Sequence, residues 1–319
     1  MLYCLRKNFN FNCLPELSSN ISDNNILPVW LNLLGRCHRR FKLVQIAKKI
    51  LYRSGIDLNR FISGHQYIER IKIYSGLPIA LHLDDHIDNI IWWNGYYEKH
   101  PTRIFLKLTN PGDCVVDVGA NIGYYSVLAA SRIGSAGKIF AFEPVLSIYQ
   151  RLLENVSELK NIKPEKVACG NTTGEIKIYV ADDTCSAGSR ISQPIENHPL
   201  KIETVPIIKL DNELMGEKVD LLKIDVEGYE TEVLRGAVKL IRTNPQIKIF
   251  IEISKKLLEM AGSSPEEIFN LLTGLGLQPW KVELIGDKYL LLLQKDYWKD
   301  ENLILFAKKE YLPHELLGE

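Results

Sequence analysis

Four apolar runs, separated by segments of helical spacing, dominate the middle of the chain. The runs are Cys114 to Gly119, Lys138 to Pro144, Val219 to Gly228 and Ile247 to Ser254. Each is mostly apolar and rich in β-branched residues or Phe and Leu, which is typical of strands buried on both faces of a parallel sheet. The segments 124–134, 146–159 and 230–242 have the spacing of helices that would cover those faces. The pattern predicts an α/β, doubly wound fold.

Other parts of the chain show the two-residue alternation of strands in place of helical spacing. Residues Arg70 to Leu83 alternate between apolar and polar around a Ser-Gly pair, which predicts a β-hairpin. Helical spacing lapses between Ala168 and Leu210, where strands are expected at 174–180 and 203–210 around a polar loop. We expect this insertion to lie at the sheet edge or over the functional site. The apolar run from Glu301 to Lys309 is a candidate for the last strand of the sheet.

The pair Pro111-Gly112, which interrupts helices and strands, precedes the α/β pattern. Farther upstream, residues 32–55 have apolar positions at helical spacing and a basic opposite face, which predicts an amphipathic surface helix. The alternative is a helix that lies on a membrane or binds an acidic partner. We therefore predict an N-terminal extension of helices and a β-hairpin over residues 1–99. The α/β domain is expected over residues 100–312.

Composition narrows the class of protein. The 319 residues include 39 Lys and Arg and 39 Asp and Glu, so no net charge would draw the whole chain to nucleic acid. No apolar segment reaches the roughly 20 residues that span a bilayer, and no signal peptide is recognisable. The six cysteines form no C-x-x-C pair, which disfavours a zinc ribbon or an iron–sulfur cluster. We expect a cytoplasmic protein with no transmembrane segment and no nucleic-acid partner.

Ligand sites of open parallel sheets lie at the carboxyl ends of the strands, where the strand order reverses. The first apolar run contains Asp117 and ends in a turn with Gly119 and Gly123, and the second ends at Glu143. Glu143 lies 20 residues beyond Gly123 (143 − 123). An acid in that place can accept hydrogen bonds from both hydroxyls of a ribose. The glycine turn and the acid together predict a cofactor that contains a nucleoside.

Two classes of cofactor are considered as ligands of this turn. A dinucleotide fingerprint is G-x-G-x-x-G and places a pyrophosphate at a helix N-terminus, whereas this turn is G-x-x-x-G after Asp117. A carboxylate there would repel a pyrophosphate and would suit a cationic amino group. S-adenosylmethionine carries an adenosine, an amino group and a sulfonium, so its charges fit better. A nicotinamide-dependent oxidoreductase is disfavoured but remains an alternative.

Four stretches together resemble the FkbM-type family of S-adenosylmethionine-dependent methyltransferases. They are VVDVGANIGYYSVLAA from Val115, KIFAFEP from Lys138, VDLLKIDVEGYETEVLRGA from Val219 and IFIEIS from Ile249. The resemblance covers roughly residues 95–255, and KIDVEGYE is more specific than the glycine turn. It implies a class I methyltransferase (Rossmann-like) fold with a mostly parallel seven-stranded sheet whose last strand is antiparallel. It also implies methyl transfer, usually to a hydroxyl oxygen.

The same resemblance assigns cofactor contacts by position. The residues expected to bind S-adenosylmethionine are Asp117, Gly119, Ala120, Asn121, Gly123, Tyr124, Glu143, Pro144 and Asp225. Glu143 would hold the ribose hydroxyls, and Asp225 would lie beside the sulfonium and the methyl acceptor. The acceptor is expected to be a saccharide or a small secondary metabolite.

Three charged side chains are the candidates for catalysis. Lys223, Asp225 and Glu227 alternate along an extended segment and are expected to share one face. We predict that Asp225 or Glu227 takes the proton of the acceptor hydroxyl, with Lys223 as its electrostatic partner; the alternative is a structural ion pair. The spacing requires no metal, although Mg²⁺ held by Asp225, Glu227 and either Glu252 or His198 is an alternative. An alternative to the enzymatic function is a non-catalytic protein that binds an adenosine cofactor.

Overall fold

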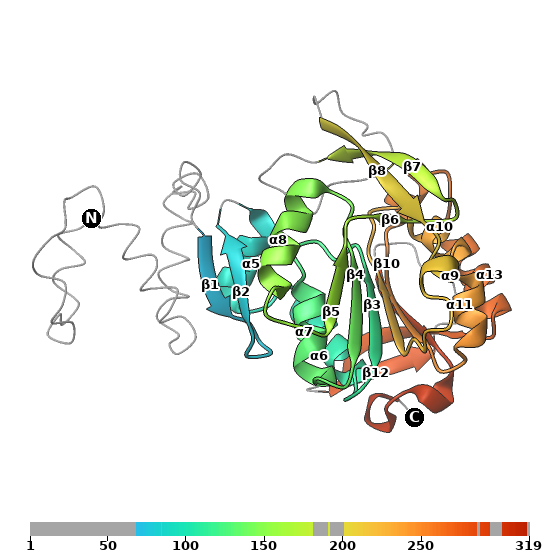
Figure 1. The fold of residues 1–319 in the computed structure, drawn as a ribbon. Helices are drawn as coiled ribbons and strands as arrows, with labels where there is room; N and C mark the ends of the chain where they lie inside the picture. The colour runs from blue at the N-terminus through green and yellow to red at the C-terminus, as the bar shows by residue number, and fades with distance from the viewer. Residues whose placement is uncertain are drawn as a thin grey trace, which may run out of the picture. The chain divides into compact units, whose positions relative to one another are not determined.

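The computed structural model describes residues 68–83, 85–180, 191, 201–285, 288–293 and 302–317. Residues Gln66–Glu319 form one compact unit (Figure 1). The predicted β-hairpin belongs to this unit together with the α/β sheet, and the predicted boundary near residue 100 stays a prediction. The amphipathic helix predicted within residues 32–55 lies outside the described residues.

The described residues form a central sheet of eight strands in the order β12-β11-β13-β10-β9-β3-β4-β5. In chain order these are β3 (Cys114–Val118), β4 (Lys138–Phe142), β5 (Ile162–Glu165), β9 (Leu221–Ile224), β10 (Lys248–Ile253), β11 (Gln278–Ile285), β12 (Lys288–Leu293) and β13 (Asn302–Ala307). The strands from β10 to β5 pair in parallel, and β13 pairs antiparallel with β10 and β11. The predicted antiparallel last strand is confirmed. An eighth strand, β12, adds to the predicted seven as the antiparallel partner of β11.

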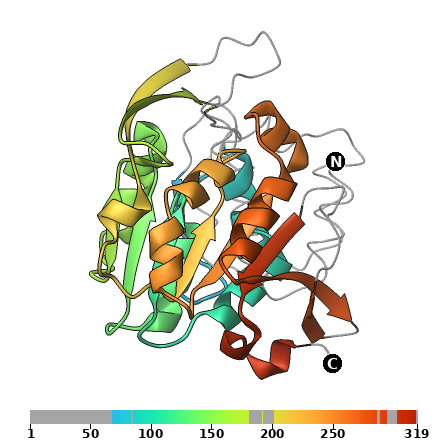
Figure 2. The same cartoon turned by 90° about the vertical axis from the view of Figure 1, so that its right-hand side faces the viewer.

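Helices cover both faces of the sheet (Figures 1 and 2). One face carries α6 (Lys99–Leu108), α7 (Tyr124–Ile133) and α8 (Leu146–Val156), and the other carries α10 (Glu230–Arg235), α11 (Val238–Thr243) and α13 (Pro265–Gly274). The remaining described helices are α5 (His86–Asn94), α9 (Leu210–Glu213), α12 (Lys255–Met260), η5 (Lys309–Tyr311) and η6 (His314–Leu316). The doubly wound α/β prediction is confirmed. None of the described helices is long and apolar enough to cross a membrane.

The packing explains why the strand runs are apolar throughout. Val116, Leu222 and Ile251 are fully buried in one core cluster with residues of α10, α11 and α13. On the opposite face, the ring of Phe105 from α6 packs edge-on against Phe250 of β10, with 5.6 Å between the ring centroids. Each such buried side chain contributes about 1.5–3 kcal/mol to folding. A strand covered on both faces therefore favours apolar residues at most of its positions.

One predicted helix is broken in the structure. The segment 230–242 forms two helices, α10 and α11, separated at Gly236-Ala237. A Cβ atom on Gly236 would lie 2.0 Å from the backbone oxygen of Gly170, so the chain approaches another backbone closely here. Local spacing cannot show such a contact, because the two residues are far apart in sequence.

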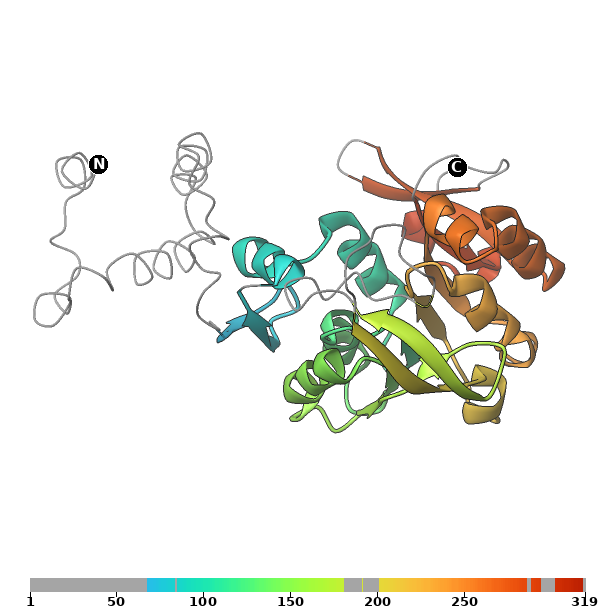
Figure 3. The ribbon, with the colours of Figure 1, turned by 90° about the horizontal axis from the view of Figure 1, so that it is seen from above.

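The predicted insertion forms a separate three-stranded sheet, β6-β8-β7. Its strands are β6 (Ala168–Cys169), β7 (Gly174–Val180) and β8 (Lys201–Ile208), and β7 and β8 pair antiparallel above the central sheet (Figure 3). Ile178 of β7 and Cys169 of β6 line the cleft described below. Of the two expected places, the sheet edge or over the site, the structure shows this insertion lining the cleft.

The hairpin of β1 (Ile68–Lys72) and β2 (Pro78–His82) is tied to helix α8 by buried polar contacts. The side-chain oxygen of Asn155 accepts from the Ala80 amide at 2.7 Å, and its side-chain nitrogen donates to the backbone oxygens of Ala80 and Ile122. Arg151 of α8 forms ion pairs with Asp85 and Asp88 at the start of α5. Helix α8 begins three residues after Glu143, so these contacts also support the cleft.

Candidate active site

A cleft lies at the carboxyl ends of β3, β4, β9 and β10, where the strand order reverses between β3 and β9. The predicted site residues that line it are Gly119, Ala120, Asn121, Tyr124, Glu143, Pro144, Lys223, Asp225 and Glu227. Asp117 and Gly123 do not line it. The structure thus brings most of the predicted residues together, as expected for strand ends in a doubly wound sheet.

The turn after β3 has its backbone N–H groups occupied by protein acceptors. The amides of Gly119 and Ala120 both donate to the Phe142 oxygen at 3.0 Å. The Asn121 amide donates to Glu143 Oε2 at 3.0 Å, and the Ile122 amide donates to the Asn121 side chain at 2.7 Å. The turn is therefore braced internally by these contacts.

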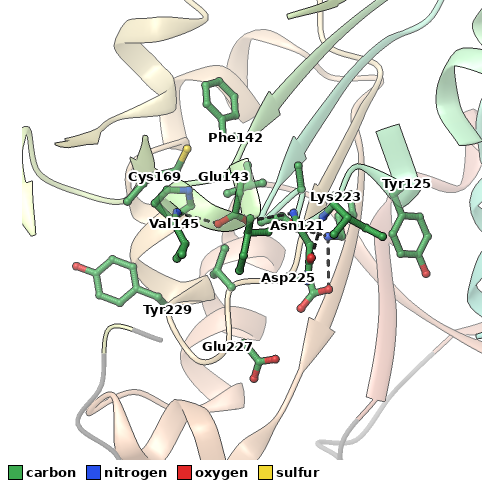
Figure 4. A pocket seen from close by; sticks show the side chains of 18 of the residues that line it. Asn121, Tyr125, Phe142, Glu143, Val145, Cys169, Lys223, Asp225, Glu227 and Tyr229 are labelled. Atoms are coloured by element: carbon green, nitrogen blue, oxygen red, sulfur yellow. Dashed lines mark hydrogen bonds and ion pairs between the residues drawn. The ribbon is translucent and has the colours of Figure 1, made fainter. Parts of the chain in front are cut away.

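Glu143 is the central acid of the cleft and is 5% exposed. Its Oε2 accepts from the Asn121 amide and its Oε1 accepts from the Val145 amide at 2.9 Å (Figure 4). Burial raises its pKa to about 7, and the two backbone hydrogen bonds oppose this rise. An ionised carboxylate has about four acceptor sites. The two backbone donors therefore leave acceptor capacity for a ligand that brings two hydroxyl groups.

Apolar and charged residues lie on opposite sides of Glu143 (Figure 4). Val145, Cys169 and Tyr229 lie on one side, and Lys223 and Asp225 lie on the other. Ile148, Val167 and Ile178 extend the apolar lining. Sequence reasoning missed this apolar wall, because its members come from four separate segments and none carries a motif.

Lys223 is a buried cation held by three oxygen atoms. Its Nζ donates to the Gly119 backbone oxygen at 2.8 Å and lies 3.3 Å from Asp117 Oδ1 and 3.4 Å from Asp225 Oδ2. Asp117 is fully buried beneath the turn and also accepts from the Ser126 hydroxyl at 2.7 Å. Burial opposes the charge of Lys223, but the two carboxylates outweigh it, and the pKa of Lys223 is raised. Asp117 thus braces the site from below, while Lys223 joins β3 to β9.

Replacing Lys223 with methionine is expected to destabilise the protein by about 3–5 kcal/mol, because Asp117 would remain as a buried charge without its cation. The free energy of unfolding in urea measures the effect. The double variant Lys223→Met with Asp117→Asn should recover part of the loss. A loss below about 1 kcal/mol in the single variant would contradict this account of the ion pair.

The outer side of the cleft is acidic. Asp225 and Glu227 follow β9, Glu252 is the next-to-last residue of β10, and Glu98 precedes α6. The expectation that Asp225 and Glu227 share the face of an extended segment with Lys223 is wrong for Glu227. Strand β9 ends at Ile224, and Glu227 has a φ of 53°. Left-handed backbone at residues other than glycine stores strain and is concentrated at functional sites; Glu98 and Asn121 also have it.

Two of these acids, Glu252 and Glu98, have raised pKa values. The pKa of Glu252 rises from its ordinary value of 4.5 to about 8, first because of burial and then because of Asp225, Glu98 and Glu227, against a smaller opposing effect of Lys223. The pKa of Glu98 is also raised, by local loss of solvent and by Asp225. Among the described residues, no three His, Cys, Asp or Glu side chains are arranged to hold a metal ion. His198 lies outside the described residues.

The raised pKa of Glu252 predicts a pH-dependent stability. Between pH 4.5 and pH 8 the folded protein retains a proton on Glu252 that the unfolded chain has lost, so stability falls as pH rises through this window. The variant Glu252→Gln removes this loss. Its unfolding free energy should exceed that of the wild type by on the order of 2 kcal/mol at pH 8, and by much less at pH 5. An equal effect at both pH values would contradict the raised pKa.

Comparison with known proteins agrees with this geometry. A model of the methyltransferase FkbM domain matches residues 117–279, which include the end of β3 with its turn, Glu143, the acids after β9 and Glu252 of β10. The hexuronic acid methyltransferase AglP of Haloferax volcanii is 24% identical over 177 residues, which are 55% of this chain and 68% of that protein. The 2-O-methyltransferase NoeI of Sinorhizobium fredii is 25% identical over 150 residues, covering 42% of this chain and 61% of that protein.

Among solved structures, the methyltransferase FkbM of Methylobacillus flagellatus is 15% identical, with 86% of this chain and 58% of that chain covered and a TM-score of 0.37. The family model spans 163 residues (279 − 117 + 1) of the 319 in the chain. These residues are half of the sequence. They include every cleft-lining residue except those that precede residue 117. The chain belongs to the family of FkbM methyltransferase domains.

Proposed function

We propose that this protein transfers a methyl group from S-adenosylmethionine to a hydroxyl oxygen of a saccharide or of a small secondary metabolite. The observation that carries the proposal is the position of Glu143. This nearly buried acid lies between an apolar wall and an acidic outer cleft whose cation, Lys223, is already bound by protein oxygens. A cofactor with a flat apolar base, a ribose and a positive charge matches that order of surfaces.

The two inner surfaces suit a nucleoside. The apolar lining from Val145, Cys169 and Ile178 would cover an adenine ring. The carboxylate of Glu143 would accept hydrogen bonds from both ribose hydroxyls, since two backbone amides use only part of its acceptor capacity. Hydroxyl donors would also favour its ionised form, against the burial that raises its pKa.

The outer cleft suits a cation. Asp225, Glu227 and Glu252 line it, and the turn after β3 offers no free amide to an anion. Carboxylates in a cleft of low polarity stabilise a nearby positive charge and repel a phosphate. When it is bound, the cofactor supplies a methyl group on a sulfonium and leaves as a neutral thioether, which needs no acid. The electrostatics therefore favour S-adenosylmethionine over a nicotinamide dinucleotide.

The remaining task of the protein is to align the acceptor and to remove its proton. Alignment of reacting groups lowers a barrier by up to about 7–11 kcal/mol, and a general base adds about 10²- to 10⁴-fold. Asp225 and Glu227 are the proposed bases, with Lys223 fixing Asp225 through the contact of 3.4 Å. A hydroxyl acceptor on a sugar is supported by the names of two relatives, a hexuronic acid methyltransferase and a 2-O-methyltransferase.

Calorimetric titration of the purified full chain with S-adenosylmethionine, S-adenosylhomocysteine and NAD tests the cofactor. We expect both sulfur nucleosides to bind and NAD to remain unbound. Binding of NAD alone, or of no ligand, would overturn the proposal. Methyl transfer is then measured with radiolabelled cofactor and a panel of uronic acid and neutral saccharides. Cofactor binding with replaceable Asp225 and Glu227 would instead support a non-catalytic adenosine-binding protein.

A further inference from the structure

The charges that line the cleft are unbalanced. Among the described lining residues, Lys223 is the single cation, and it is already shared between Asp117, Asp225 and a backbone oxygen. Glu227 and Glu252 also line the cleft, and Glu98 at its margin interacts electrostatically with both Asp225 and Glu252. Ionised carboxylates so arranged destabilise one another. Either a bound proton or a cationic ligand reduces the repulsion within such a group of carboxylates.

Strand register places Glu252 next to the end of β9. Phe250 of β10 pairs with Lys223 of β9. Because side chains two residues apart on a strand share a face, Glu252 follows Phe250 on the face that carries Lys223. The neighbouring Ile251 and Ile253 are fully buried in the core on the other face. The backbone of Glu252 is also fixed on the other side by its pairing with Leu303 of β13. A rigid strand therefore holds this carboxylate beside Asp225.

Asp225 and Glu252 differ in their partners. Asp225 has the Lys223 ammonium at 3.4 Å. Glu252 forms no ion pair of this kind within the described residues, and the charges that act on it most strongly are the carboxylates of Asp225, Glu98 and Glu227. Burial and these three acids raise the pKa of Glu252 to about 8. Of the two strand-end acids, Glu252 is the one in a setting that favours the protonated form.

We propose that Glu252 carries a proton when no cofactor is bound, releases it when a cationic methyl donor enters the cleft, and then accepts the proton of the acceptor hydroxyl. This inference rests on the proposed function and deepens it. It adds a catalytic residue to the candidates Asp225 and Glu227, and it links the charge of the donor to the protonation of the base.

The proposed step conserves charge within the cleft. The acceptor oxygen forms a bond to the methyl carbon, the sulfur–methyl bond breaks with its electron pair on sulfur, and the acceptor proton passes to an Oε atom of Glu252. One positive charge and one carboxylate are thereby replaced by a neutral thioether and a neutral carboxyl group. The loss of the positive charge restores the setting in which Glu252 holds a proton. The residue therefore ends the step in the protonation state that it had before the donor entered.

Other titratable groups act on Glu252 and define the test. Asp225, Glu227 and Lys223 act from β9 and the turn after it, Glu98 and Tyr97 act from the segment before α6, and Tyr125 acts from α7. Glu143 has a pKa of about 7 and is also expected to release protons when a ribose binds. That release is common to S-adenosylmethionine and S-adenosylhomocysteine. The difference between the two ligands therefore isolates the response to the sulfonium charge.

The experiment measures proton release on binding. The full chain is titrated at pH 7 with each ligand in two buffers of different ionisation enthalpy, and the observed enthalpies give the number of protons released. S-adenosylmethionine is expected to release more protons than S-adenosylhomocysteine, by up to about 0.9, the protonated fraction at pH 7 of a group whose pKa is about 8. Equal release by the two ligands in the wild type would overturn the inference, and this comparison needs no variant.

The variant Glu252→Gln assigns the proton. It should still bind both ligands and should lose most of the difference between them, whereas Glu259→Gln, an exposed acid on α12, should keep it. A difference that persists in Glu252→Gln would assign the proton to another acid and overturn the inference while the proposed function stands. If the wild type binds neither ligand, the proposed function fails and this inference fails with it.

Discussion

Replacing Glu143 with alanine is expected to weaken the binding of S-adenosylmethionine by at least about a hundredfold. Two hydrogen bonds from ribose hydroxyls to a charged acceptor contribute about 1.5–3 kcal/mol each, and about 1.4 kcal/mol corresponds to a factor of ten. The buried carboxylate also accepts from the amides of Asn121 and Val145, so the variant loses two braces of the cofactor turn as well. Calorimetric titration gives the dissociation constants of S-adenosylmethionine from the wild type and from Glu143→Ala.

Glu143→Gln is the matched control for this loss. It retains the shape of the side chain and one acceptor oxygen, so its affinity should lie between those of the wild type and Glu143→Ala. Affinity of the wild type should also rise as pH increases from 6 to 8, because the pKa of about 7 leaves Glu143 partly protonated in that range and a ribose requires the ionised acceptor. An alanine variant that folds and binds the cofactor as tightly as the wild type would contradict the proposed ribose contact.

Replacing Gly119 with alanine should have the largest effect on stability. A Cβ atom on Gly119 would lie 1.8 Å from the backbone oxygen of Asp225, and the φ of Gly119 is +75°. The neighbour is backbone at the end of a central strand, so it cannot move without separating the turns after β3 and β9. We expect a loss of more than about 4 kcal/mol, or failure to fold, measured by urea unfolding.

Gly112→Ala separates the steric effect from the backbone strain. Gly112 has a φ of +83°, and nothing lies within 4 Å of an added Cβ atom. A residue other than glycine in this conformation costs about 1–2 kcal/mol. The difference between the two variants therefore measures the close approach of Gly119 to Asp225. Equal losses at both positions would show that strain alone makes Gly119 necessary.

The position of Glu143 was predictable from sequence, whereas its hydrogen bonds were not. An apolar run followed by an acid marks the end of a buried strand, and parallel strands bring their carboxyl ends to one edge. The same reasoning located Asp225, and it applies to Glu252 at the end of the run from Ile247. The occupied amides of Gly119 and Ala120 depend on the Phe142 oxygen of the next strand. Spacing within the turn alone cannot show that these amides are bound by a strand from another segment.

Asp117 and Glu227 show two ways in which spacing was insufficient. Asp117 lies within a fully buried strand, so its side chain meets Lys223 and Ser126 under the turn and does not reach the cleft lining. Glu227 lies beyond the end of β9 in left-handed backbone, so strand alternation no longer governs its direction. In both cases the residue type was informative and the assumed local geometry was not.

The sequence by itself determined four strands of the central sheet, the doubly wound class and the acids at the strand ends, because burial on both faces of a sheet imposes an apolar pattern that a single chain segment displays. Only the tertiary structure decided which of these acids face the cleft, that Lys223 is shared between Asp117 and Asp225, and that Glu252 lies among like charges. The physical reason is the separation in sequence between the residues that interact. Burial patterns arise within one segment, whereas the protonation of a carboxylate depends on charges that strand pairing brings close from separate parts of the chain.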